Sequence, residues 1–291
     1  MGGVWVILII VFLLVLLSGG KKKSGPEGRA AGSKQPEHMP GIDPKDNTDL
    51  PACPYNPHLS IMYNFLSPLL RELYGLMYEA LRAGKYSVTV PRGLKQEEIT
   101  FLVDCIYNEA PELCAYDRWN TTVVDHYGET ILHLAYKRPI SEQERFIREV
   151  DELSRQFAGK TEEQGIRAIC NYLISRFSYG FADGVDTQLA YDALQTNKAV
   201  CNGYAQCAVM FAHFAGYPCC YINGSVYDEA GKYQGGHAWN ATMFGDRYFW
   251  FDTTWNDGGS VPLRSSLIMD TRQIGTIYRV APGYQCIPYS A

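Results

Sequence analysis

The sequence predicts an α+β fold in a chain of 291 residues. Hydrophobic residues make up 46% of the chain and charged residues 20%, a globular composition with enough length for one large domain or two modest ones. Apolar residues follow a helical period in 141–177 and again in 201–216. Residues 235–255 instead carry two strand-like runs around a Gly-Asp turn, as a β-hairpin does. We therefore expect an α+β domain over 141–291.

The N-terminus carries an unbroken apolar run from Val4 to Leu17. With its flanking glycines, this run approaches the roughly 20 residues that span a bilayer. A cleaved signal peptide would carry positive charge before the run, whereas Lys21–Lys23 follow it here. Residues 1–20 are therefore expected to be a membrane anchor or signal-like segment. The position of the lysines favours a cytoplasmic location for the rest of the chain.

Residues 21–55 are expected to form a flexible linker, because they are rich in Gly, Pro, Lys, Asp and Ser and have few apolar side chains to bury. Residues 56–140 then predict a small α/β domain. Its first helix covers 58–82, where Pro68 can kink or restart the helix and Gly84 can end it. A strand at 85–91, a helix at 95–108 and strands within 116–136 follow.

Two capping boxes predict the first helices of the α+β domain. Ser141 with Glu144 would open one helix, because such a pair satisfies the free N–H groups of a helix start. Thr161 with Gln164 would open the next in the same way. Each helix carries an apolar stripe that is expected to face the core. The stripes are Phe146, Val150, Leu153 and Phe157 on the first helix, and Ile166, Ile169, Leu173 and Phe177 on the second.

Charge and cysteine usage exclude several classes of function. The formal net charge is -5 and no basic stripe follows Lys23, so nucleic acid is not an expected partner. The nine cysteines include no CxxC pair, which excludes a zinc ribbon or a thioredoxin motif, and we expect no metal and no cofactor. Several polar or thiol side chains are instead expected to be structural or buried, namely Cys170, Cys207, Cys219, Cys220 and His213.

Cys201 is the first candidate for chemistry. It precedes an apolar helical pattern that ends at Gly216, so it should lie at a helix N-terminus. There the unpaired backbone N–H groups and the positive end of the helix dipole favour a thiolate, which is the form that attacks carbonyls. The same N–H groups can bind the oxyanion that forms on attack. The missing side chain of Gly203 could let a substrate backbone approach closely.

The hairpin places two further candidates together. If Gly245 and Asp246 close its turn, Phe244 faces Arg247. Continuing this register puts His237 opposite Thr254, with Asp252 diagonal to His237 on the same face at a separation of roughly 7–8 Å. Polar side chains bridge such a distance, so the register predicts a His–Asp pair. The aspartate would hold the imidazole in one tautomer and stabilise its charged form.

The order and surroundings of these residues resemble the bacterial branch of the transglutaminase-like superfamily. The three motifs are Ala-Val-Cys201-Asn-Gly-Tyr-Ala, His237-Ala-Trp-Asn and Asp252-Thr-Thr-Trp, and the similarity runs over 187–257. It implies a papain-like core in which the cysteine helix packs on an antiparallel sheet that carries the histidine and aspartate. It also implies an extracytoplasmic location for the domain, against the indication from the lysines. Tyr191, on a helix just upstream, would line the site or support the oxyanion, or else serve as a packing aromatic.

This resemblance implies acyl transfer with Cys201 as nucleophile, His237 as base and Asp252 as the residue that orients the histidine. Water as acceptor gives a peptidase-like hydrolase, which we rank first, and an amine gives a transglutaminase-type cross-linker. A membrane-tethered scaffold that binds peptide or cell-wall material without turnover is the third reading. The expected partners are a peptide or protein substrate and, through residues 1–20, a membrane. Trp239, on the strand face of His237, is expected to serve substrate binding or shielding.

Overall fold

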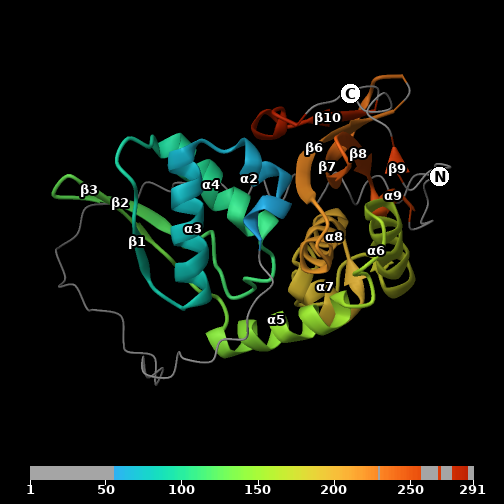
Figure 1. Ribbon diagram of the computed structural model, residues 1–291, viewed down its shortest axis with the longest axis horizontal. Coiled ribbons are helices and arrows are strands. Elements are labelled where there is room, and N and C mark those ends of the chain that lie inside the picture. Colours follow the sequence, from blue (N-terminus) through green and yellow to red (C-terminus); the bar gives the residue numbers. More distant parts are fainter. Residues whose placement is uncertain (1–55, 229, 257–267, 270–276, 288–291) are drawn as a thin grey trace, which may run out of the picture. The chain divides into compact units, whose positions relative to one another are not determined.

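The computed structural model in Figure 1 describes residues 56–228, 230–256, 268–269 and 277–287. The predicted anchor at 1–20 and the predicted linker at 21–55 lie outside the described residues. Within the described ranges, no helix combines the length and the apolar character needed to cross a membrane. Ala52–Ala291 forms one compact unit.

The first part of this unit contains three α-helices and a small sheet. The helical segments are η1 (Pro57–Leu59), α2 (Ile61–Phe65), α3 (Pro68–Arg82) and α4 (Gln96–Glu109). The antiparallel sheet has the order β1-β3-β2 and is formed by β1 (Ser87–Thr89), β2 (Thr122–His126) and β3 (Glu129–His133). The predicted restart at Pro68 is confirmed: the Ser67 hydroxyl accepts the Leu70 N–H at 3.4 Å, and proline occupies the first turn, where its missing donor costs nothing.

Four helices follow along the chain, namely α5 (Ile140–Ser154), α6 (Glu162–Arg176), α7 (Ala190–Thr196) and α8 (Cys201–Ala215). The capping box of Thr161 and Gln164 is confirmed, because each side chain bonds the other's backbone N–H at 3.4 Å. The box predicted for Ser141 is wrong. The helix α5 begins at Ile140, two residues before a helix capped by Ser141 would begin, with Pro139 as its N-cap in an extended conformation, so Ser141 lies inside the first turn.

The larger sheet is antiparallel with the order β10-β6-β7-β8-β9. Its strands are β6 (Cys219–Tyr227), β7 (Tyr233–Phe244), β8 (Arg247–Phe251), β9 (Ile268–Met269) and β10 (Tyr278–Val280). The predicted hairpin register is confirmed, since Phe244 faces Arg247, and Gly245 adopts the positive φ of 57° that the tight turn requires. A short parallel pair joins β4 (Ser178–Tyr179) to β5 (Lys198–Ala199) just before α8. The helical segments α9 (Thr253–Asn256) and η3 (Pro282–Tyr284) complete the described chain.

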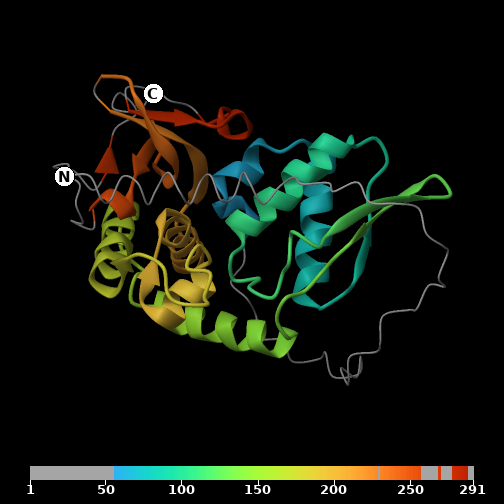
Figure 2. The same ribbon diagram turned by 180° about the vertical axis from the view of Figure 1, so that it is seen from behind.

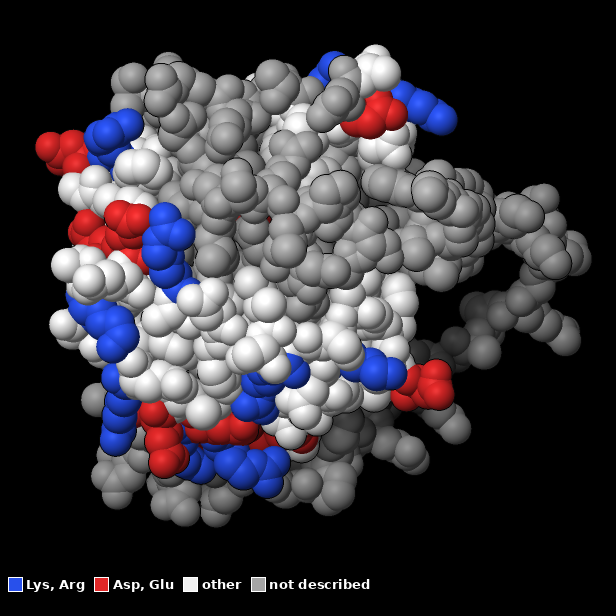
Figure 3. All heavy atoms as spheres, turned by 90° about the vertical axis from the view of Figure 1, so that its right-hand side faces the viewer, with Lys and Arg blue, Asp and Glu red and all other residues white. Residues whose placement is uncertain are grey.

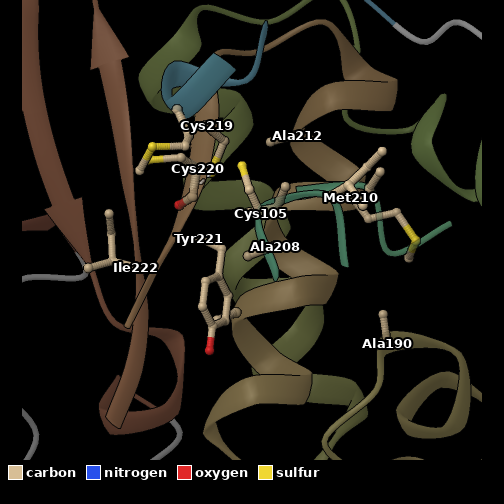
Figure 4. Packing of buried hydrophobic residues seen from close by; sticks show 14 of the residues in the cluster. Cys105, Ala190, Ala208, Met210, Ala212, Cys219, Cys220, Tyr221 and Ile222 are labelled. Carbon is tan, nitrogen blue, oxygen red and sulfur yellow. Dashed lines mark hydrogen bonds between the residues drawn. The ribbon is translucent and has the colours of Figure 1, made fainter. Parts of the chain in front are cut away.

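The helix α8 lies at the centre of the core. The sheet covers one side of it and α5, α6 and α7 pack around the rest, as Figures 1 and 2 show from opposite directions. Figure 4 shows Ala208 and Ala212 of α8 close to Cys219, Cys220 and Tyr221 of β6. The predicted apolar stripes face this core, with Leu153 only half-buried. Helices and an antiparallel sheet thus form the mixed fold that the sequence predicted.

The residues expected to be structural are buried in this core. Cys170, Cys207, Cys219 and Cys220 have no exposed surface. His213 is buried as well, and its Nε2 lies 2.9 Å from the Cys219 carbonyl oxygen. On the face shown in Figure 3, the basic and acidic side chains of the described residues are interspersed around uncharged ones.

Candidate active site

Cys201 is the first residue of α8, as predicted. The pairing of β5 with β4 brings the chain to this point, and Val200 precedes the helix in an extended conformation. Valine has no side-chain acceptor that could cap the first N–H groups of the helix. The helix ends at Gly216 with a left-handed φ of 87°. Cys201 is partly exposed, whereas the following turns of α8 are buried, so its thiol is the accessible sulfur of this helix.

His237 and Asp252 form the predicted pair. The imidazole Nε2 lies 2.7 Å from the Asp252 Oδ2, and both side chains are almost completely buried. The hairpin extends less far than predicted, because β8 ends at Phe251 and α9 begins at Thr253. His237 therefore has no strand partner at Thr254, and it faces Gly224 of β6 on its other side. The bend at Asp252 turns the carboxylate toward the imidazole.

Cys201 is among the groups that raise the pKa of His237, which places the start of α8 near the imidazole. Burial lowers the pKa of His237, but the charge and hydrogen bond of Asp252, together with the interaction with Cys201, outweigh burial and raise this pKa from 6.5 to about 10. The imidazole is therefore in its charged form at neutral pH.

Two further groups among the described residues bond Asp252. The Tyr278 hydroxyl donates to Oδ2 at 2.9 Å, and the Trp255 backbone N–H donates to Oδ1 at 3.1 Å. Tyr278 comes from β10, 26 residues beyond Asp252 in the chain. No local pattern connects them, whereas Trp255 was present in the Asp252-Thr-Thr-Trp motif.

Aromatic rings enclose the His–Asp pair. The Trp239 ring stacks on His237 at a centroid distance of 5.9 Å, and the Trp255 ring lies at 5.4 Å. Tyr278 contacts both the imidazole, at 6.3 Å, and Trp239, at 5.0 Å. The predicted position of Trp239 on the face of His237 is therefore confirmed. Since Trp239 is only 1% exposed, it can shield the imidazole from water but offers almost no surface to a substrate.

Packing within the protein, and not the approach of a substrate, requires glycine at position 203. It is buried, and a Cβ atom at this position would lie 2.4 Å from the Thr187 carbonyl oxygen and 3.2 Å from the Ala199 Cβ. The protein's own chain therefore fills the space that we expected to be open. The missing side chain lets the loop before α7 pack against the start of α8.

Tyr191 packs away from the groups named above. Its ring contacts Phe146 edge-on at 5.0 Å and lies under the Arg138 guanidinium at 4.6 Å. Arg138 in turn forms a bidentate pair with Asp192 at 2.7 and 2.8 Å. These contacts match the packing alternative for Tyr191.

Other polar groups lie close to the thiol. Asn202, the next residue, accepts a hydrogen bond from the Tyr221 hydroxyl at 2.9 Å and donates one to the Gln188 Oε1 at 3.1 Å. Tyr179, on β4, is partly exposed, and burial together with its electrostatic interactions with Cys201 and Asp252 raises its pKa. Its hydroxyl therefore stays protonated beside the site. Neither Tyr179 nor Tyr221 carried a signal in the sequence, because their proximity comes from strand pairing.

Metal binding is not evident at this site. Within the described part of the chain, no three His, Cys, Asp or Glu side chains are arranged to hold an ion. Of the three predicted residues, His237 and Asp252 bond each other directly.

A cysteine at the start of a buried helix, beside an antiparallel sheet whose histidine bonds an aspartate, is the arrangement that the sequence led us to expect of a transglutaminase-like core. Residues 151–253 match the family model of the transglutaminase-like superfamily, and this range includes Cys201, His237 and Asp252. The chain therefore carries a transglutaminase-like domain, as its three motifs predicted. No curated protein matches the chain.

Three solved structures resemble the chain at low identity. A candidate cysteine protease from Cytophaga hutchinsonii is 14% identical, with a TM-score of 0.32 over 52% of this chain and 65% of that one. A TGase is 16% identical, with a TM-score of 0.32 over 66% and 56%. The periplasmic domain of TgpA from Pseudomonas aeruginosa, bound to ethylmercury, is 16% identical, with a TM-score of 0.31 over 44% and 55%. The chain covers less than two thirds of the length of each.

Proposed function

We propose that this protein transfers acyl groups from peptide or protein amides through Cys201, and that water is the main acceptor. The observation that carries the proposal is the buried His237–Asp252 pair, with Cys201 at the start of α8 near the imidazole. An imidazolium held in this way stabilises a neighbouring thiolate and can later donate its proton. The transglutaminase-like match over the same residues supports the same chemistry.

The reaction begins when the Cys201 thiolate attacks the substrate carbonyl carbon. The negative charge that develops on the carbonyl oxygen is stabilised by the uncapped N–H groups at the start of α8. The imidazolium of His237 donates its proton to the amide nitrogen, the C–N bond breaks, and an amine leaves from the thioester. Asp252 keeps its charge throughout and holds the imidazole in one orientation.

Hydrolysis of the thioester completes the cycle. Neutral His237 takes a proton from water, the hydroxide oxygen attacks the thioester carbon, and the carboxylic acid leaves as Cys201 regains its thiolate. An amine acceptor would follow the same path and yield a new amide. The two outcomes differ only in which nucleophile reaches the thioester.

Alkylation by iodoacetamide, mapped by mass spectrometry, tests the nucleophile. We expect rapid modification of Cys201 in the parent and loss of that modification in Cys201→Ala. Cys286→Ser is the matched control, since Cys286 is the exposed cysteine of the described residues and should have no role. Equal modification of several cysteines in the parent would refute an activated thiolate at Cys201.

The acceptor is tested with unfolded casein as acyl donor, with and without a fluorescent primary amine. Release of new peptide termini that depends on Cys201 supports hydrolysis. Incorporation of the amine without new termini would instead establish cross-linking. A folded parent protein with neither product, despite selective alkylation of Cys201, would contradict acyl transfer from protein amides.

A further inference from the structure

Glu109 is a buried carboxyl group that the proposed mechanism does not use. It is the last residue of α4 and only 1% exposed. Its Oε1 accepts the Tyr221 backbone N–H at 2.7 Å, and its Oε2 accepts the Ser60 hydroxyl at 2.7 Å. Burial raises the pKa of Glu109 to about 8, although both hydrogen bonds lower it, while the nearby Glu112 raises it further. Such a group is costly to bury and stays in a fold only where it is well bonded.

The position of Glu109 follows from an unpaired stretch of β6. On one side, Tyr221 faces Asn240 of β7. On the other side, β10 pairs with β6 only from Gly224 onward, so no strand among the described residues lies beside Tyr221 there. The carboxyl group of Glu109 takes the place of that strand and accepts the N–H that points away from β7. Glu109 therefore fixes the backbone of β6 at Tyr221.

Tyr221 transmits this position to the start of α8. Its hydroxyl donates to Oδ1 of Asn202 at 2.9 Å, and Asn202 immediately follows Cys201. Figure 4 shows the Tyr221 ring lying alongside α8 with its hydroxyl directed along the helix. The Asn202 amide also donates to Gln188 at 3.1 Å. The first turn of α8 is thereby held from two sides.

The C-terminal end of α4 also bonds α8 directly, through Gln206. Gln206, one turn after Asn202, donates to the Asn108 Oδ1 at 3.2 Å and to the Tyr107 carbonyl oxygen at 3.4 Å. Its own Oε1 accepts the Ala190 N–H at 3.1 Å. Three consecutive residues at the end of α4 thus bond α8 or β6.

We propose that Glu109 is a positioning residue for the nucleophile, acting through Tyr221 and Asn202 on the first turn of α8. This inference rests on the proposed function of Cys201. Glu109 lies outside residues 151–253, so the matched family domain does not contain the whole of its own active site. The region before it supplies part of the support that sets the direction of the thiol.

The test is the single-turnover acylation of Cys201 by a p-nitrophenyl ester, with thermal unfolding measured in parallel. Glu109→Leu keeps the volume but not the acceptor, and we expect acylation at saturating ester to slow by about tenfold or more, since a shift of about 1 Å can cost on the order of 100-fold. Glu109→Gln keeps an acceptor for Tyr221 and a donor for Ser60, so it should recover most of the rate that Glu109→Leu loses.

Tyr221→Phe removes only the hydroxyl and should slow acylation about as much as Glu109→Leu does. The ester concentration for half-saturation should stay unchanged throughout.

The double variant and a matched control decide the route. If Glu109 acts through Tyr221, Glu109→Leu with Tyr221→Phe should be no slower than the slower single variant. Glu112→Gln changes a neighbouring buried carboxyl that bonds Tyr78 at 3.0 Å, and it should react like the parent. A parent-like rate in Tyr221→Phe, or effects that multiply in the double variant, would overturn the proposal.

Tyr221→Phe keeps the hydrogen bond between the residue 221 backbone N–H and Glu109. Its acylation rate therefore still tests the route through the Tyr221 hydroxyl if Glu109→Leu does not fold. Selective alkylation of Cys201 in the parent separates this outcome from a failure of the proposed function.

Discussion

Asp252 accepts hydrogen bonds from three different parts of the chain, namely the His237 imidazole, the Tyr278 hydroxyl and the Trp255 backbone. A buried carboxylate keeps its charge only when its oxygens are satisfied in this way. The result is a fixed negative charge next to a fixed ring. This is the residue-scale feature on which the charged state of His237 depends.

Asp252→Asn should move the alkaline limit of acylation to lower pH. Asp252 is the main group that raises the pKa of His237, whereas burial lowers it, so removal of the carboxylate charge should lower this pKa. In the parent, the stability contributed by charged His237 is complete below pH 6.5 and is lost as the pH rises through about 10. In the variant, the imidazolium should be lost well below that value. The pH profile of single-turnover acylation, with Asp246→Asn in the exposed turn as control, measures the shift, and an unchanged alkaline limit would contradict the role of Asp252.

At this scale, the sequence predicted the pairs that lie in one hairpin. The register of β7 and β8 follows from the turn at Gly245 and was predicted, but it ends at Asn240 and Phe251, so Asp252 reaches His237 from the residue after β8. Tyr278 was not predictable, since it reaches Asp252 from a strand whose pairing with β6 no local pattern specifies. The reason for Gly203 was also missed, because Thr187 approaches it from another loop.

The helices and strands follow local rules, and most were predicted for that reason. Thr161 caps α6, Pro68 starts α3 and Gly216 ends α8, each through a backbone preference of its own residue type. The exception is α5, where Pro139 determines the start in place of Ser141. Within α8, position 203 must be glycine because the Thr187 carbonyl oxygen of the loop before α7 approaches it closely.

Two helix glycines give a matched comparison at the scale of the element. Gly203→Ala should destabilise the protein by about 1–3 kcal/mol, because the new Cβ would meet the Thr187 carbonyl at 2.4 Å and force a backbone shift. Gly75→Ala in α3 should instead stabilise it by about 0.5–1 kcal/mol, since no atom lies within 4 Å of the new Cβ and alanine favours the helix. Urea unfolding of the two variants measures both. If both substitutions changed the free energy of unfolding equally and in the same direction, close packing would not be the reason for glycine at position 203.

At the scale of the molecule, the region before residue 141 packs directly on the transglutaminase-like domain. Ser60 forms a parallel bridge with Cys219, and α4 contacts both α8 and β6. These contacts could not be predicted, because the sequence shows only that 56–140 has strands and helices of its own. The division into 56–140 and 141–291 stays a prediction about folding units.

Truncation tests that division. A chain that begins at Ala52 keeps every contact that the described residues make with one another, and it should unfold cooperatively and react like the full chain. A chain that begins at Ser141 loses Ser60, Glu109 and the cover over β6, so it should lack a cooperative thermal transition. Circular dichroism and iodoacetamide labelling measure both properties. Cooperative unfolding of the shorter chain would mean that residues 141–291 fold without the preceding region.

The bridge between Ser60 and Cys219 also constrains the order in which a growing chain can acquire its structure. During synthesis, α2 and α4 leave the ribosome long before β6, so Ser60 and the Glu109 carboxyl must wait for partners more than 100 residues downstream. Contacts so distant in sequence form slowly, because a long loop must close before they contribute. Until β6 arrives, the early helices expose surfaces that the finished protein covers, and this interval is the period in which the nascent chain most needs protection from aggregation.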